Sequence, residues 1–232
     1  MNYLALDAST EACSVALKIG NTITSRYELC PQSHSLMLLP MVDELLKEAG
    51  KQLSDLDGLI FGRGPGSFTG VRIGVGVVQG LAFSAQLPVV GVSSLQAMAQ
   101  IAFDKYQQPR VIATIDARMS EVYNGYYVVN EQGIMQLQGN ETVLAPQKLS
   151  QHLADNSVQA AYGVGTGWDA YADELSALKE NPNSPDVLFP SAEAMLTIGA
   201  FAFSQGEGVE AQDAQPSYVR DTVSWKKLPG RE

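Results

Sequence analysis

The chain has 232 residues, 45% of them hydrophobic and 17% charged, and a formal net charge of −10. This size and balance predict one large or two small globular domains, and the acidity disfavours direct binding of a nucleic-acid backbone, which depends on Lys and Arg. No apolar run reaches about 18 residues and the N-terminus lacks a basic leader region, so we expect a cytoplasmic protein with no membrane span and no secretion signal.

The first half begins with a short apolar strand that ends in Asp7. An alternating strand, the turn signal Gly20-Asn21 and a partner strand then predict a hairpin. Ser and Gly at the appropriate ends mark the helices that follow. In chain order we expect strands at 3–7, 13–19, 22–28, 58–62 and 89–92, and helices at 33–49, 67–85 and from Ser93 or Ser94 to about Tyr106.

The second half repeats this order of elements without similar residues. A strand at 111–116 again ends in Asp, and a hairpin crosses residues 130–133. A helix at 146–154, a strand at 158–164, and helices at 168–178 and 191–204 follow.

The repeated order predicts an α/β protein of two ribonuclease-H-like domains, as in the actin/sugar-kinase/Hsp70 (ASKHA) superfamily. We expect them at 1–105 and 106–232, with the helix at 191–204 able to pack back on the first domain. A single doubly wound sheet is the alternative, disfavoured because the hairpins place antiparallel strands in each half.

A glycine-rich loop, "FGRGPGSFTGVRIG", lies between the strand at 58–62 and the helix at 67–85. A phosphate-binding P-loop would require Lys after its last glycine, and a dinucleotide fingerprint would require a different glycine spacing. Position alone still suits an anion at a helix N-terminus. Ser67 and Thr69 are therefore a candidate anion site.

The helix at 67–85 is apolar on nearly all sides, and the helix at 33–49 has a wide apolar face. One sheet cannot cover all of this apolar surface, which favours contact with a second protein. For the helix at 33–49, a wide core face is the alternative. The expected partner interface comprises Leu36, Met37, Leu39, Met41, Val71, Gly74, Val75 and Val78.

The sequence holds no convincing set of catalytic residues. Two Asp-containing turns suggest a vestigial nucleotide site at Asp7, Ser9, Thr10 and Asp116, although ordinary caps and turns explain them at least as well. The two histidines are far apart in sequence, and no spacing suits a metal. We therefore expect no metal, no cofactor and no catalytic residues.

Four stretches in order, "GRGPGSFTGVRIG", "GVSSLQAMA", "DARMSEVYNGYY" and "PSYVRDTVSWKK", resemble the TsaB (YeaZ) family, which takes part in forming threonylcarbamoyladenosine at position 37 of tRNA. The resemblance covers essentially the whole chain and implies a non-catalytic paralogue of TsaD, the transferase subunit. TsaD-like proteins carry a metal-binding histidine pair where this chain has Ser94 and Met98.

The resemblance also implies a scaffold or activator role and a set of partners. It implies a TsaD-like subunit bound through the N-terminal helices, a homodimer when the chain is alone, a TsaE-like ATPase in the complex, and tRNA reached only through the complex. A weak ATP-binding or ATPase protein and an inactive metallopeptidase-like homologue are the alternatives. The C-terminal cluster of Arg220, Lys226, Lys227 and Arg231 is either a solvated tail or a contact for an anionic partner.

Overall fold

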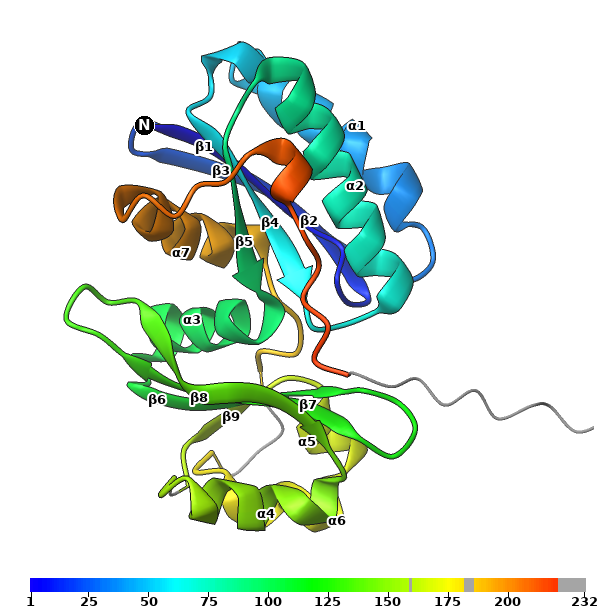
Figure 1. Cartoon of the computed structure of the whole chain (residues 1–232), viewed down its shortest axis with the longest axis vertical. Helices are drawn as coiled ribbons and strands as arrows, with labels where there is room; N and C mark the ends of the chain where they lie inside the picture. Colours follow the sequence, from blue (N-terminus) through cyan, green and yellow to red (C-terminus); the bar gives the residue numbers. More distant parts are fainter. Residues whose placement is uncertain (159, 182–185, 221–232) are drawn as a thin grey trace, which may run out of the picture.

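A computed structural model describes residues 1–158, 160–181 and 186–220 (Figure 1). The chain folds into two α/β halves, each built on its own sheet, and the halves lie one above the other in Figure 1. Lys226, Lys227 and Arg231 of the basic C-terminal cluster lie outside the described residues.

The first sheet has the strand order β3-β2-β1-β4-β5. β1, β2 and β3 form an antiparallel meander, because the tight turn at Gly20 and Asn21 returns the chain at once. β4 and β5 run parallel to β1 and require helical connections. The strands are β1 (Asn2–Asp7), β2 (Ala12–Ile19), β3 (Thr22–Leu29), β4 (Gly58–Gly64) and β5 (Val89–Ser93).

Helices cover both faces of the first sheet (Figure 1). On one face lie α1 (His34–Glu48) and α2 (Phe68–Ala85), with the short turns η1 (Leu53–Asp55) and η3 (Ala211–Asp213) at their sides. On the other lies α7 (Ala192–Ser204), which comes from the C-terminal part of the chain and packs against β1, β2, β4 and β5.

The second sheet has the order β8-β7-β6-β9, formed by β6 (Arg110–Asp116), β7 (Val122–Val129), β8 (Met135–Leu144) and β9 (Tyr162–Val164). One face packs on α3 (Ser94–Tyr106), which also contacts α7 and so lies between the two sheets. The other face is covered by α4 (Pro146–Asp155), α5 (Gly167–Ala170), α6 (Ala172–Leu175) and η2 (Ser176–Leu178).

The structure confirms two ribonuclease-H-like halves, since each has a three-stranded meander, a helix, a parallel strand and a further helix. Two elements differ from expectation. The strand expected at 158–164 is shortened to β9, and the helix expected at 168–178 is broken at Tyr171, whose φ of −133° is not helical. Trp168, near the start of this broken helix, is buried, and its indole Nε1 donates to the carbonyl of Val164 at 3.0 Å.

The expected domain boundary at 105 and 106 stays a prediction. α3 lies before that boundary, yet it contributes Leu95, Met98 and Ala102 to the core of the second sheet. α7 lies after it, yet it contributes Met195 and Ile198 to the core of the first.

The helix α2 has 18 residues and a mean hydropathy of 1.3, which is the length and composition of a membrane-spanning helix. Its sequence is not an uninterrupted apolar run, because Thr69, Arg72, Gln79 and Ser84 lie within it. In the structure one side of α2 packs on β1 and β4, as the core helix of a globular protein does.

The packing of α7 on β4 generates a first prediction. A Cβ on Gly199 would lie 2.5 Å from Cδ1 of Ile60, whereas a Cβ on Gly80 of α2 would meet no atom within 4 Å. We expect Gly199→Ala to destabilise the protein by about 1–3 kcal/mol through overpacking. The control Gly80→Ala should stabilise it by about 1 kcal/mol, because Ala favours a helix over Gly.

Urea unfolding of dilute protein measures both changes. An equal or larger stability for Gly199→Ala would contradict the close packing of α7 on the first sheet.

Candidate functional site

The glycine-rich loop between β4 and α2 packs on the turn that follows β1. A Cβ on Gly66 would lie 2.0 Å from the carbonyl oxygen of Ser9, and a Cβ on Gly70 would lie 2.1 Å from that of Ala8. The Ser67 N–H donates to the Ser9 carbonyl at 2.7 Å. The glycines therefore allow two backbones of the same chain to touch.

The two residues of the candidate anion site, Ser67 and Thr69, lie in different surroundings. The hydroxyl of Ser67 accepts a hydrogen bond from the N–H of Gly70 at 3.3 Å and so serves as the N-cap of α2. Ser67 also lines a cavity at the helix N-terminus, whereas Thr69 is exposed and is not part of that lining. Anion binding by these two residues stays a prediction.

This cavity, of about 480 Å³, lies between the two halves. Its walls come from the turn after β1, the N-termini of α1 and α2, and the end of β6. It brings together four of the expected nucleotide and anion residues, Ser9, Thr10, Ser67 and Asp116, and adds Glu11, His34, Arg118 and Arg220.

Asp7, also expected at the nucleotide site, is not part of the cavity lining and is fully buried. Its carboxylate accepts from the N–H of Ser9 at 3.3 Å and from the Ser9 hydroxyl at 3.2 Å. Burial raises the pKa of Asp7 to about 6, and the hydrogen bonds of Ser9 oppose the shift only in part. Asp7 is therefore placed to hold Ser9 rather than to meet a ligand.

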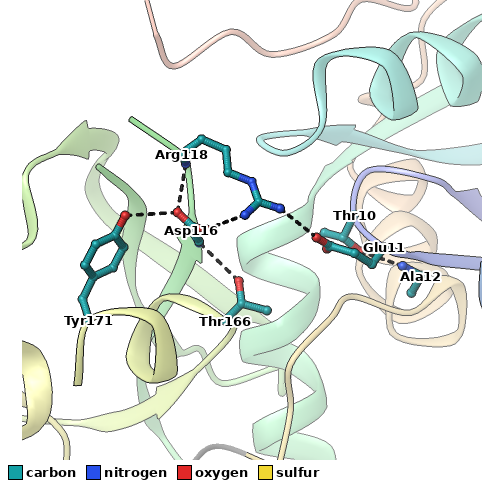
Figure 2. Close-up of polar contacts among 7 residues, drawn as sticks. All are labelled: Thr10, Glu11, Ala12, Asp116, Arg118, Thr166 and Tyr171. Carbon is teal, nitrogen blue, oxygen red and sulfur yellow. Dashed lines mark hydrogen bonds and ion pairs between the residues drawn. The ribbon is translucent and has the colours of Figure 1, made fainter. Parts of the chain in front are cut away.

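Asp116 is the centre of a polar network shown in Figure 2. Its Oδ1 accepts from the N–H of Arg118 at 2.9 Å and from the hydroxyl of Tyr171 at 3.2 Å. Its Oδ2 pairs with Nη1 of Arg118 at 3.1 Å, and its own N–H donates to the hydroxyl of Thr166 at 3.2 Å. The carboxylate therefore fixes the turn that follows β6.

Arg118 bridges the two halves of the chain. Its guanidinium lies 3.6 Å from the carboxylate of Glu11, which belongs to the turn after β1 (Figure 2). Arg118, Met119 and Ser120 all have φ near +60°, a left-handed conformation that is costly for residues other than Gly. The sequence does not predict this bridge, because no local pattern shows that the two turns meet.

His34 also faces this cavity, at the N-terminus of α1. The side chain is buried, and its Nε2 has no hydrogen-bond partner among the described residues. Nearby, Arg220 donates to the carbonyl of Ala117 at 3.2 Å and pairs with Glu121 at 2.6 Å. The cavity thus combines two helix N-termini, two arginines and an unpartnered imidazole nitrogen.

The expected partner interface needs correction. Five of its residues point into the core against the first sheet, namely Met41, Val71, Gly74, Val75 and Val78. Their burial explains much of the apolar breadth of both helices, and on α1 the burial of Met41 agrees with the alternative of a wide core face. Met37 is half-buried, while Leu36 and Leu39 are 73% and 49% exposed.

On α2 the outward positions are different from those expected. Gly76 and Gly80 are exposed, and a Cβ on either would meet no atom within 4 Å. Ile73 and Val77 are half-buried beside them, and Phe68 and Phe83 lie exposed at the two ends. We define the outer helical face as Leu36, Met37, Leu39, Ile73, Gly76, Val77 and Gly80.

The described residues contain no group of three His, Cys, Asp or Glu side chains that could hold a metal ion. Ser94 and Met98 are both buried at the start of α3. The hydroxyl of Ser94 donates to that of Ser9 at 2.7 Å, so this position connects α3 to the turn after β1.

The burial of Asp7 generates a prediction about pH. Because the folded-state pKa is raised from 3.8 to about 6, the stability linked to its proton is present below pH 4 and is lost as pH rises through 6. In the wild type, ionisation of Asp7 should lower the free energy of unfolding by about 3 kcal/mol between roughly pH 4 and 7. Asp7→Asn should not show this decrease. Urea unfolding at both pH values, with the exposed Asp173→Asn as control, measures the difference. Parallel pH profiles for the wild type and Asp7→Asn would refute a raised pKa.

The chain is similar to known proteins in both sequence and structure. A family model described as "TsaD: tRNA N6-adenosine threonylcarbamoyltransferase" matches residues 19–222. The chain is 46% identical over 232 residues to the tRNA threonylcarbamoyladenosine biosynthesis protein TsaB of Escherichia coli, with 100% of both chains covered. It is 45% identical to TsaB of Haemophilus influenzae, covering 100% of this chain and 99% of the relative.

A solved structure agrees. YeaZ from Pseudomonas aeruginosa superimposes with a TM-score of 0.82 at 47% sequence identity, covering 94% of this chain and 99% of that one. These matches confirm the resemblance drawn from the four sequence motifs. The chain belongs to the TsaB (YeaZ) family of tRNA threonylcarbamoyladenosine biosynthesis proteins.

Proposed function

We propose that the chain is a non-catalytic scaffold or activator subunit of the complex that forms N6-threonylcarbamoyladenosine at position 37 of tRNA, where it binds and supports a TsaD-like transferase subunit. The observation that carries the proposal is the outer helical face. Leu36 and Leu39 remain exposed, and Met37, Ile73 and Val77 are only half-buried, although the core beneath α1 and α2 is already filled. An apolar helix surface left over after the core is complete is typical of a partner interface.

The shape of this face favours a helical partner. Gly76 and Gly80 are one turn apart and leave a shallow strip on α2, flanked by the half-buried Ile73 and Val77. Leu36 and Leu39 are exposed in the N-terminal half of α1, which packs beside α2. A partner helix can approach the glycine backbone closely while its apolar side chains cover the leucines.

Family membership supports the choice of partner. The family model that matches most of this chain is described as a transferase, and an oligomer of related folds can use equivalent helices on both sides. We infer that the chain forms a homodimer when alone and exchanges it for the TsaD-like partner through the same face. A TsaE-like ATPase and tRNA then meet the assembled complex in the cytoplasm, not this acidic chain by itself.

The proposal predicts that Gly76→Arg abolishes binding of a TsaD-like subunit and leaves a folded monomer. The added side chain enters open space in the free chain but would occupy the place of the partner helix. Size-exclusion chromatography with light scattering, with and without the partner, measures the result. Charges at Val71 or Val75 are unsuitable, because both side chains are buried and a charge there would unfold the chain.

A matched control is Ala154→Arg on α4, which adds the same charge to an exposed helix of the other half. It should bind the partner as the wild type does. Undiminished association of Gly76→Arg, or equal loss in Ala154→Arg, would count against the outer helical face.

A second candidate function is weak nucleotide binding, favoured by the unpartnered Nε2 of His34 in the cavity between the halves. Arg118 is the arginine of that cavity that an anionic ligand could recruit from its carboxylate partners. Calorimetry with ATP and Mg²⁺ tests it. Micromolar affinity that falls by about tenfold or more in Arg118→Ala supports this function. The absence of any binding heat at millimolar ATP would exclude it.

The metallopeptidase-like alternative has no observation in its favour. The two histidines of the sequence, His34 and His152, lie on α1 and α4 in different halves of the molecule.

A further inference from the structure

The β3 strand is an open edge of the first sheet. It pairs with β2 on one side only, and no other strand of the described residues lies beside it. Proteins usually protect such edges with charges, proline or a covering segment. β3 carries two charged side chains, Arg26 and Glu28, but it also exposes three large apolar ones, Ile23 at 42%, Tyr27 at 46% and Leu29 at 61%.

The backbone of the same residues faces the open side. Residues that flank a two-residue hairpin turn exchange hydrogen bonds, and such pairs recur at every second residue. With Ile19 opposite Thr22, the backbone groups of Ile23, Ser25, Tyr27 and Leu29 therefore point away from β2. The Ser25 carbonyl accepts from Nη1 of Arg26 at 3.0 Å, which agrees with this direction. A carbonyl oxygen can accept a second hydrogen bond, so the edge remains available.

A groove of about 560 Å³ runs beside this edge on the α7 side of the sheet. The side chains of Ile23, Tyr27 and Leu29 form one wall, and Ile101, Val187 and Phe189 contribute apolar surface opposite. A strand added to β3 would direct every second side chain into this groove, since side chains alternate along a strand.

The charge of the groove indicates the chemistry of the occupant. Asp104, Asp186 and Glu193 line it. Of the two cations in the lining, Lys105 is exposed, and the guanidinium of Arg26 is bound by Glu44 of α1 at 2.9 Å. Burial and the charge of Glu193 raise the pKa of Asp104, as expected where carboxylates lie close together. If a second copy of this chain occupied the groove, the carboxylates of the two copies would repel one another, so a second copy is disfavoured as the occupant.

We propose that β3 and the adjoining groove bind an extended segment of another protein that alternates apolar and basic side chains, by addition of a strand to the sheet. Main-chain hydrogen bonds to Ser25 and Tyr27 hold the segment, apolar side chains enter between β3 and Phe189, and basic side chains meet Asp104 and Glu193. This surface lies on the sheet face opposite α1 and α2, so it is separate from the outer helical face.

The test uses the full chain and a fluorescein-labelled, end-capped octapeptide that alternates valine and lysine, at about 0.15 M salt. Fluorescence anisotropy should give micromolar binding. Ser25→Pro removes an N–H on the open side without touching the ladder to β2, and it should weaken binding by about tenfold or more. Ser25→Ala is its matched control, because both variants lose the hydroxyl that donates to Glu193 at 3.2 Å and only Ser25→Pro also loses the N–H. Ser25→Ala should therefore bind about tenfold or more tightly than Ser25→Pro.

The charge contribution has its own pair of variants. The double variant Asp104→Asn and Glu193→Gln should weaken binding by about tenfold. The double variant Asp169→Asn and Asp173→Asn removes the same charge from the other half of the molecule and should leave binding unchanged. No binding at millimolar peptide, or equal binding by all variants, would overturn the proposal.

Two further outcomes would replace the proposed occupant. A chain that ends at Arg220 and binds the peptide about tenfold more tightly than the full chain would identify the chain's own C-terminal segment. A dimer that Ser25→Pro dissociates in light scattering would identify a second copy.

Discussion

The contact between the β4–α2 loop and the turn after β1 organises the first half of the molecule. The Ser67 N–H donates to the Ser9 carbonyl at 2.7 Å, and the absence of side chains at Gly66 and Gly70 lets the two backbones meet. Because this contact fixes where α2 begins, it also fixes which residues of α2 enter the core. The outer helical face and the mouth of the cavity between the halves both follow from it.

The same turn connects the first half to the second. Glu11 lies within reach of Arg118 from the turn after β6, and Ser94 at the start of α3 donates to Ser9. The left-handed conformation of Arg118, Met119 and Ser120 is costly and is held by hydrogen bonds to Asp116 and by Arg220. A polar cavity with arginines already paired to carboxylates can accept an anion only by exchanging those partners, which limits the affinity of the cleft for nucleotides.

The two surfaces proposed for protein binding use different physics. The outer helical face offers exposed apolar side chains and bare helix backbone, so its binding would depend mainly on apolar burial and close packing. The β3 edge offers unpaired backbone groups beside a groove rimmed by carboxylates, so its binding would depend on main-chain hydrogen bonds and on charge. Salt should therefore weaken the second surface more than the first.

The sequence by itself determined the order of elements, the two-half architecture and the family, because hairpin turns, helix caps and apolar periodicity act over a few residues. It also excluded a P-loop and a metal-binding histidine pair, since these depend on residue type and spacing. Only the tertiary structure decided which apolar residues of α1 and α2 are core and which are surface, because a helix that is apolar all round has no polar side to orient it. Likewise, only the fold could bring Asp116, Arg118 and Glu11 together, bury Asp7 outside the cavity lining, and leave β3 without a neighbour, because these contacts join residues far apart in the chain.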